Sequence, residues 1–175
     1  GTRLAQLAQE TTASPALQAE FTGVVQDVLA RGARAVEIAP RDYRTYLSIG
    51  SVYDLLASLR IEGAYQSARS SYELAVERNP TSPAIPLIMA RLEAAQGNVQ
   101  ITEKHLQKAL TLKPNYTDAM LFVVQLAVAQ NDLPTATRAA ESAVQTAPGV
   151  ASIWFQLGLL YYAGGDTAKA IQPLE

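Results

Sequence analysis

Residues 151–170 read ASIWFQLGLLYYAGGDTAKA, and this stretch decides how the chain folds. An apolar run over residues 151–163 has helical spacing and ends at Gly164 and Gly165, after which a second helical pattern begins. Glycine readily adopts the left-handed backbone conformation that ends helices. The stretch therefore predicts two helices joined by a short turn, that is, a helical hairpin.

The same pattern recurs along the chain every 34 residues. Counting back from Gly165, the turn position is occupied by Asn131, Gly97 and Gly63. Three further ladders keep the interval: Pro80, Pro114 and Pro148; Ala75, Ala109 and Ala143; Ala68, Thr102, Ala136 and Ala170. A fixed period of this length is typical of stacked structural repeats. We therefore expect an all-α fold of antiparallel helical hairpins stacked side by side.

The turn and proline ladders also set the expected helix bounds, because a glycine ends the first helix of each hairpin and a proline follows the second. First helices are expected near residues 43–57, 83–96, 117–130 and 151–163, and second helices near residues 63–78, 98–112, 133–146 and 167–175. Pro86 and Pro134 fit this scheme because each falls in a first turn, where the missing N–H has no helical partner.

The amino-terminal part lacks the period and is expected to form degenerate capping helices over residues 1–39. Ser14 and Pro15 predict the cap and first residue of a helix that runs to about Ile38, preceded by a short helix near residues 3–10. The repeat array then covers residues 40–175, with repeats at about 43–80, 83–114, 117–148 and 151–175. Because residue 1 is glycine and the last second helix stops at Glu175, we expect a piece of a longer protein.

The first repeat is longer than the others. Pro40 and Pro80 are forty residues apart, six more than the period, and the excess lies between Tyr53 and Gly63 in the segment DLLASLRIE. The sequence therefore predicts a longer first helix or a protruding loop in this hairpin.

The repeating positions resemble the tetratricopeptide repeat family, whose pattern combines Trp, Leu-Gly, Tyr, Ala and Pro at fixed spacing. The last hairpin carries Trp154, Leu157, Gly158, Tyr161, Gly165 and Ala170, and the first carries Tyr46, Ile49, Gly50, Tyr53, Ala68, Tyr72, Ala75 and Pro80. The resemblance covers residues 40–175. It implies a right-handed superhelical stack, an α-solenoid, whose first helices line a concave groove that binds a protein or peptide.

A narrower resemblance concerns residues 41–80, with the elongated hairpin. This segment looks like the soluble tail of bacterial multi-spanning membrane proteins similar to O-antigen ligases or polymerases. It implies an alternative role as the aqueous accessory domain of a cell-envelope glycan ligase or polymerase, whose catalytic part lies outside these residues. The cellular location stays open between these readings.

Composition argues against several partner classes. The formal net charge is −2 and charged residues make up 17% of the chain, so no long-range attraction to nucleic acid or anionic membranes is expected. The longest apolar stretch, residues 119–129, is shorter than the ~20 residues of a membrane helix. The absence of cysteine excludes disulfides, thiolate metal sites and cysteine nucleophiles.

The sequence offers no catalytic, cofactor or metal constellation. His105 is the only histidine and has no companion residues at metal-ligand spacing. The glycines of residues 163–166 lack the Lys and Ser or Thr of a phosphate loop and sit where each repeat turns. Trp154 coincides with the family's packing tryptophan. We therefore expect a non-enzymatic scaffold without cofactor.

The family's inward-facing positions, projected onto this chain, give the candidate binding groove. These positions are Arg44, Leu47, Ser51, Leu87, Arg91, Leu121, Gln125, Phe155, Leu159 and Tyr162. The set predicts an apolar groove in which two guanidinium groups meet carboxylates of a peptide or amphipathic helix. The alternative for Leu47, Leu87 and Leu121 is simple packing between helices.

The last hairpin is also expected to leave an open apolar face that promotes self-association. The residues assigned to that face are Trp154, Leu157, Leu160, Tyr161, Ile171 and Leu174.

Overall fold

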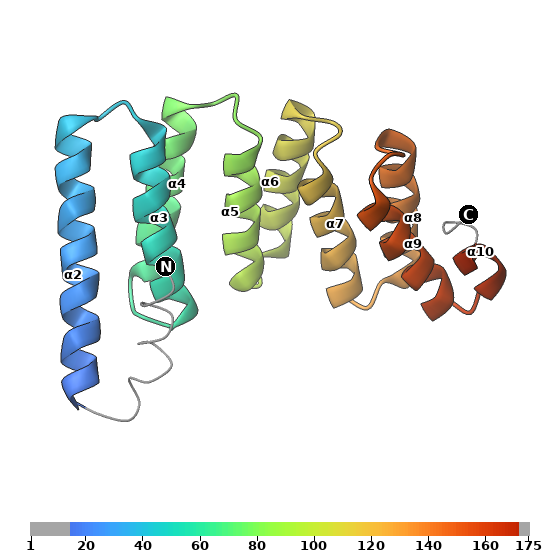
Figure 1. The fold of residues 1–175 in the computed structure, drawn as a ribbon, viewed down its shortest axis with the longest axis horizontal. Helices are drawn as coiled ribbons and strands as arrows, with labels where there is room; N and C mark the ends of the chain where they lie inside the picture. Colours follow the sequence, from blue (N-terminus) through green and yellow to red (C-terminus); the bar gives the residue numbers. More distant parts are fainter. Residues whose placement is uncertain (1–14, 172–175) are drawn as a thin grey trace. The chain divides into compact units, whose positions relative to one another are not determined.

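The computed structural model describes residues 15–171, and this part of the chain is built from α-helices without strands (Figure 1). The helices are α2 (Pro15–Ile38), α3 (Tyr43–Ser58), α4 (Ala64–Arg78), α5 (Ala84–Ala95), α6 (Val99–Leu112), α7 (Thr117–Ala129), α8 (Leu133–Thr146), α9 (Ala151–Ala163) and α10 (Thr167–Ile171). The all-α prediction is confirmed. The helix expected near residues 3–10, and Leu174, lie outside the described residues.

The helices pair as the period predicts: α3 with α4, α5 with α6, α7 with α8, and α9 with α10. The expected start and end of α2 are also confirmed. The chain divides into two compact units, one up to Ile85 and one from Pro86 onward. The proposed division at residue 39 stays a prediction.

The left-handed turn residues form the most regular feature of the array. Gly63, Gly97 and Gly165 have φ of 75°, 77° and 82°, and Asn131 has φ of 59°. Asparagine is one of the few other residues that tolerates this region, since its short polar side chain bonds locally. The four turn residues that recur every 34 positions in the sequence therefore share one backbone conformation.

The six extra residues of the first hairpin are shared among three places. Helix α3 has 16 residues, against 13 in α7 and in α9. The turn after α3 has five residues instead of three, and α4 has 15 residues against 14 in α6 and in α8. Arg60 in this turn has φ of 60°, an unfavourable conformation for a residue with a side chain. The predicted longer first helix is therefore present, and the turn that follows it is longer as well.

Small side chains let the helices of a hairpin approach closely. The ladder alanines Ala68, Ala75, Ala109 and Ala136 are all buried. In the first hairpin the close contact is between Gly50 of α3 and the buried ring of Tyr72 of α4, and a Cβ built on Gly50 would overlap ring carbons of Tyr72. The Tyr72 hydroxyl donates to Asp54 Oδ2 at 3.4 Å, and burial raises the pKa of Tyr72 above its ordinary value.

Thr102 replaces alanine in one ladder without leaving a polar atom unpaired. Its hydroxyl donates to the Asn98 carbonyl at 3.0 Å, and the Asn98 amide donates to Glu93 Oε2 at 2.7 Å. Thr102 and Glu93 are both buried, and among the residues described no buried side-chain nitrogen or oxygen lacks a hydrogen-bond partner. Satisfied polar groups are the condition for tolerating threonine at this contact.

Aromatic residues tie the first and last hairpins to the turns that precede them. The Tyr46 hydroxyl donates to the Pro40 carbonyl at 3.0 Å, and Trp154 Nε1 donates to the Pro148 carbonyl at 2.8 Å. Each aromatic stands six residues after the proline it contacts. Trp154 also packs against the buried cluster of α7, α8 and α9, which agrees with its predicted packing role.

Tyr161 links α9 to the preceding second helix. Its hydroxyl donates to Glu141 Oε1 of α8 at 2.7 Å, and Lys169 Nζ lies 5.5 Å from its ring centroid. The hydrogen bond to Glu141, followed by burial, raises the pKa of Tyr161 to about 12.

We predict that Gly50→Ala destabilises the first unit by about 1–3 kcal/mol, because Tyr72 must move to admit a methyl group. Gly23→Ala is the matched control: Gly23 lies in α2 with no atom within 4 Å of an added Cβ. Removing glycine from a helix interior there should stabilise by up to about 1 kcal/mol. Chemical denaturation measures both, and equal effects of the two variants would contradict the proposed contact.

We predict that Tyr161→Phe costs about 1 kcal/mol near neutral pH, through loss of the bond to Glu141. Because the folded pKa lies above the unfolded value of 10, this contribution is complete below pH 10 and is lost as pH rises through about 12. The gap in unfolding free energy between wild type and variant should therefore shrink over that range. A gap that stays constant from pH 9 to 12 would refute this account.

Candidate functional site

The three candidate residues of the first unit lie on α3 and are largely engaged within it. The Arg44 Nε and Nη2 atoms each bond an oxygen of Asp42 at 3.0 Å, and Asp42 also accepts from the Arg44 amide as the helix cap. The side-chain bond from Arg44 is the main reason that the pKa of Asp42 lies below its ordinary value. Ser51 donates to the Ser48 carbonyl, and Leu47 packs on the cluster of Tyr46, Ala75 and Ile85.

Leu87, Leu121 and Phe155 occupy the same repeat position in the second unit, yet their exposure differs. Leu87 is 3% exposed and belongs to a core cluster that includes Ala119 of the following first helix. Leu121 is half-buried and packs against the cluster containing Ile153 and Leu157 of α9. Phe155 is 61% exposed. For Leu87 the structure therefore supports packing between helices, and it leaves Phe155 available for a ligand.

Arg91 of α5 is an exposed guanidinium of the second unit. Its Cζ lies 5.7 Å from the ring centroid of Phe122, a cation–π geometry, and it makes no ion pair with the residues that the structure describes. Burial and the charge of Asp118 raise the pKa of Tyr116, and the positive charge of Arg91 partly offsets this rise. Arg91 can therefore meet a carboxylate, whereas Arg44 already holds one.

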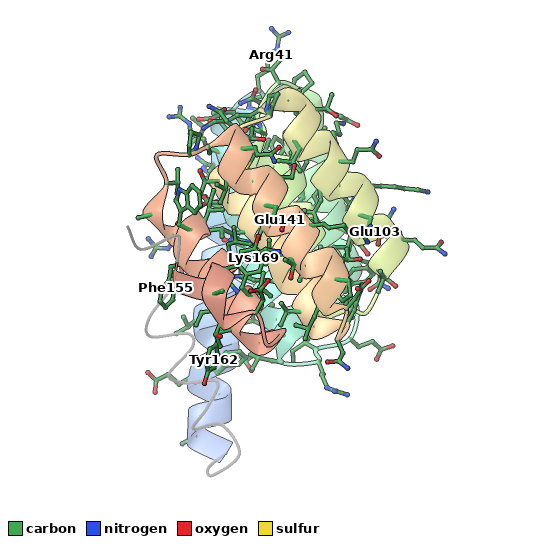
Figure 2. All side chains as sticks on the ribbon, turned by 90° about the vertical axis from the view of Figure 1, so that its right-hand side faces the viewer. Arg41, Glu103, Glu141, Phe155, Tyr162 and Lys169 are labelled. Atoms are coloured by element: carbon green, nitrogen blue, oxygen red, sulfur yellow. The ribbon has the colours of Figure 1, made fainter. Side chains whose placement is uncertain are left out.

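Three exposed apolar side chains on α9 form what we call the α9 stripe: Phe155, Leu159 and Tyr162. Their exposed fractions are 61%, 47% and 69%, and spacings of four and three residues place them on one helix face. In Figure 2, Phe155 and Tyr162 lie in the left half of the view and Glu103 of α6 lies in the right half. Isolated exposed apolar residues are ordinary, but a contiguous set indicates an interaction surface.

Val128 of α7 is an exposed apolar residue at the repeat position of Tyr162, and the sequence projection missed it. It is 41% exposed and stands one period before Tyr162, while the exposed Gln125 stands one period before Leu159. Since Tyr162 was in the predicted set, its equivalent one repeat earlier could have been found by the same interval.

The open apolar face expected on the last hairpin is only partly present. Leu157 and Leu160 were assigned to it, but both are buried in the cluster shared with α8, and Trp154 and Tyr161 are half-buried. The side chain of Ile171 and all of Leu174 lie outside the description. The face of α9 that carries Leu157 and Leu160 is therefore packed against α8. The exposed apolar residues of α9 lie on the opposite face of the helix.

Within the described residues there is no group of three or more His, Cys, Asp or Glu side chains able to hold a metal ion. His105 is half-buried in α6. Among residues 15–171, no helix has both the length and the apolar character needed to cross a bilayer.

One curated relative shows how such a segment occurs in a larger protein. The chain is 28% identical over 121 residues to a probable biofilm formation methyltransferase, WspC, of Pseudomonas putida. The match covers 67% of this chain and 28% of the relative, so the chain spans little more than a quarter of that protein.

Solved structures share the fold at low sequence identity. The crystal structure of MamA superposes with a TM-score of 0.64 and 19% identity, covering 91% of this chain and 90% of that one. The structure of YrrB, described as a TPR protein with an unusual peptide-binding site, has a TM-score of 0.55 and 18% identity, covering 98% and 88% of the two chains. Residues 123–175 match the tetratricopeptide repeat family model. Together with the helical hairpins and their 34-residue period, these matches confirm the predicted resemblance to tetratricopeptide repeat proteins.

Proposed function

We propose that this protein is an interaction scaffold that binds a peptide or helix of another protein through the first helices of its second unit. The single observation that carries the proposal is the α9 stripe, which exposes three large apolar side chains on one face. The tetratricopeptide repeat fold itself supports a scaffold for protein interactions and points away from catalysis. The similarity to YrrB, which is described as having an unusual peptide-binding site, supports the same class of ligand.

The chemistry of the surface favours an amphipathic ligand with a carboxylate. Phe155, Leu159 and Tyr162 supply apolar contacts at helical spacing, which suits the i, i+3 and i+4 anchors of a helix or the side chains of an extended peptide. Arg91 on α5 supplies a guanidinium without a carboxylate partner among the described side chains. The proposed site residues in this unit are Arg91, Leu121, Gln125, Val128, Phe155, Leu159 and Tyr162.

The extended first hairpin favours a second candidate function. In this proposal the chain is the accessory aqueous domain of a larger bacterial cell-envelope glycan ligase or polymerase, because the narrower sequence resemblance lies in this hairpin, where α3 has 16 residues. The complete gene separates the two candidates: flanking segments that encode several membrane helices would support the accessory role, and their absence would reject it.

Self-association through the same stripe is a distinct use of this surface. Two copies that cover Phe155 and Tyr162 would hide apolar area worth about 25 cal/mol per Å², before the entropy of association is subtracted. Sedimentation at several concentrations distinguishes the cases, since a monomer at all concentrations rejects self-association and leaves the peptide site intact.

We predict that a peptide selected against the wild-type protein binds at least tenfold more weakly to the double variant Phe155→Ser, Leu159→Ser. Buried apolar anchors commonly contribute 1–2 kcal/mol or more each, and tenfold corresponds to about 1.4 kcal/mol. The readout is the Kd by fluorescence anisotropy.

The control for this experiment is the double variant Val99→Ser, Leu112→Ser. Both residues are exposed and apolar, but they lie on the second helix α6. Their substitution should leave the Kd unchanged. Equal losses in both double variants would mean that the apolar character of the surface as a whole, and not the stripe, determines binding.

We predict that an acidic carboxyl-terminal peptide of the kind that chaperones display binds weakly. Arg44 is paired with Asp42, so Arg91 is left as one accessible guanidinium of the predicted pair, and convergent charge is lacking. Calorimetric titration at low and high salt checks this. Micromolar, salt-sensitive binding would show that other cations converge on the ligand.

A further inference from the structure

A hollow lies on the surface of the second unit, between the second helices α6 and α8. A cavity of about 490 Å³ is lined by Glu103, Leu106, Gln107, Leu110 and Thr111 of α6, by Val123, Leu126 and Ala127 of α7 with its cap Gln130, and by Thr135 of α8. A cavity of about 310 Å³ adjoins it, lined by Leu110, Pro114, Met120, Val123, Ala139, Ser142, Ala143 and Thr146. Leu110 and Val123 line both, so the two form one groove, which we call the outer groove.

The groove exists because α8 presents only small side chains toward α6. Ala139, Ser142 and Ala143 are too short to cover Leu110 and Val123. Its floor is tightly packed, since Leu106, Met120 and Ala127 are buried. The hollow is therefore a built feature of the packed helices and not a gap beside a mobile side chain.

The outer groove is polar at one end and apolar along its length. Helix α7 runs antiparallel to α6 and α8, so Glu103, Gln130 and Thr135 meet at one end. Glu103 is the one charged side chain in the lining of the two cavities. It is exposed and makes no ion pair with the part of the chain that the structure describes. A ligand with a positive charge at this end complements the groove.

The amide side chains at the rim of the outer groove favour a peptide ligand. Gln107 and Gln130 carry amide groups that both donate and accept hydrogen bonds, as a peptide backbone requires of its partner. From Glu103 to Thr111 the groove follows α6 for about 12 Å at 1.5 Å per residue, which matches about four residues of extended chain at 3.3 Å each.

We propose that the outer groove binds a short, extended, apolar peptide segment that ends in lysine or arginine next to Glu103. This site is separate from the α9 stripe: none of its lining residues belongs to the stripe, and Glu103 lies in the opposite half of the view from Phe155 and Tyr162 (Figure 2). The protein therefore carries two binding surfaces, one on its first helices and one between its second helices.

The test uses two capped peptides, acetyl-Leu-Val-Leu-Ala-Lys-amide and the same peptide with glutamate at the end, titrated into the full chain by calorimetry. The lysine peptide should bind about three to five times more tightly, the range of an exposed ion pair. Glu103→Gln should remove this preference, whereas Glu62→Gln, which changes the net charge equally in the first unit, should retain it.

Occupancy of the groove is tested by filling it. Ser142→Leu should weaken binding of the lysine peptide at least tenfold, and Gln145→Leu, on the exposed surface of the same helix and outside the lining, should not. Thr111→Leu fills the groove from the α6 wall and must have the same effect, so misfolding of one variant does not decide the result. Thermal melting confirms that each variant is folded.

Three outcomes would overturn the proposal: no difference between the lysine and glutamate peptides, binding that survives both filling variants, or equally tight binding of octylammonium, which would indicate an alkyl-cation site instead of a peptide site. The double variant Phe155→Ser, Leu159→Ser should bind the lysine peptide normally. Its failure to do so would place this peptide on the α9 stripe, so this proposal can fail while the proposed scaffold function stands.

Discussion

The close approach of the two helices in each hairpin is the contact on which the rest of the structure depends. Four alanines are buried at this contact: Ala68, Ala75, Ala109 and Ala136. In the first hairpin, Gly50 lies against the ring of Tyr72. The two helices of each hairpin are joined by a turn of three to five residues that contains a residue in the left-handed region. The three glycines and Asn131 at that position follow from the same geometry.

This packing also decides which residues are left for binding. Within the second unit, α7 packs against its own second helix α8, and the first helices also meet, since Leu87 shares a cluster with Ala119 and Leu121 packs against the cluster of Ile153. One repeat position shows how exposure then varies: Leu87 is buried, Leu121 is half-buried and Phe155 is exposed. On α9, Phe155, Leu159 and Tyr162 are exposed. On the second helices, the small residues of α8 leave the outer groove uncovered.

Much of the fold could be predicted because the signals are local. The interval between turn residues located each hairpin, and α7, predicted at residues 117–130, spans Thr117–Ala129. Gly63 was assigned to α4 but is its left-handed cap. The site was harder, because exposure depends on neighbours that the interval does not identify. Burial of Leu87 depends on Ala119 one hairpin later, and the engagement of Arg44 depends on the helix-capping role of Asp42. The outer groove depends on the small side chains Ala139, Ser142 and Ala143 of α8, and no sequence motif identifies such a groove.

The extended first hairpin shows how this architecture accommodates change. Its six additional residues are divided among α3, the turn and α4, and the 34-residue interval resumes at the next turn, Gly97. Each hairpin packs mainly with elements adjacent to it in sequence, so the loop closures needed to form it are short. Chains of this kind can nucleate at more than one hairpin and grow outward, and a length change in one module need not slow the others. Insertions can therefore accumulate in single hairpins during evolution and give each a different surface, while the folding of its neighbours proceeds as before.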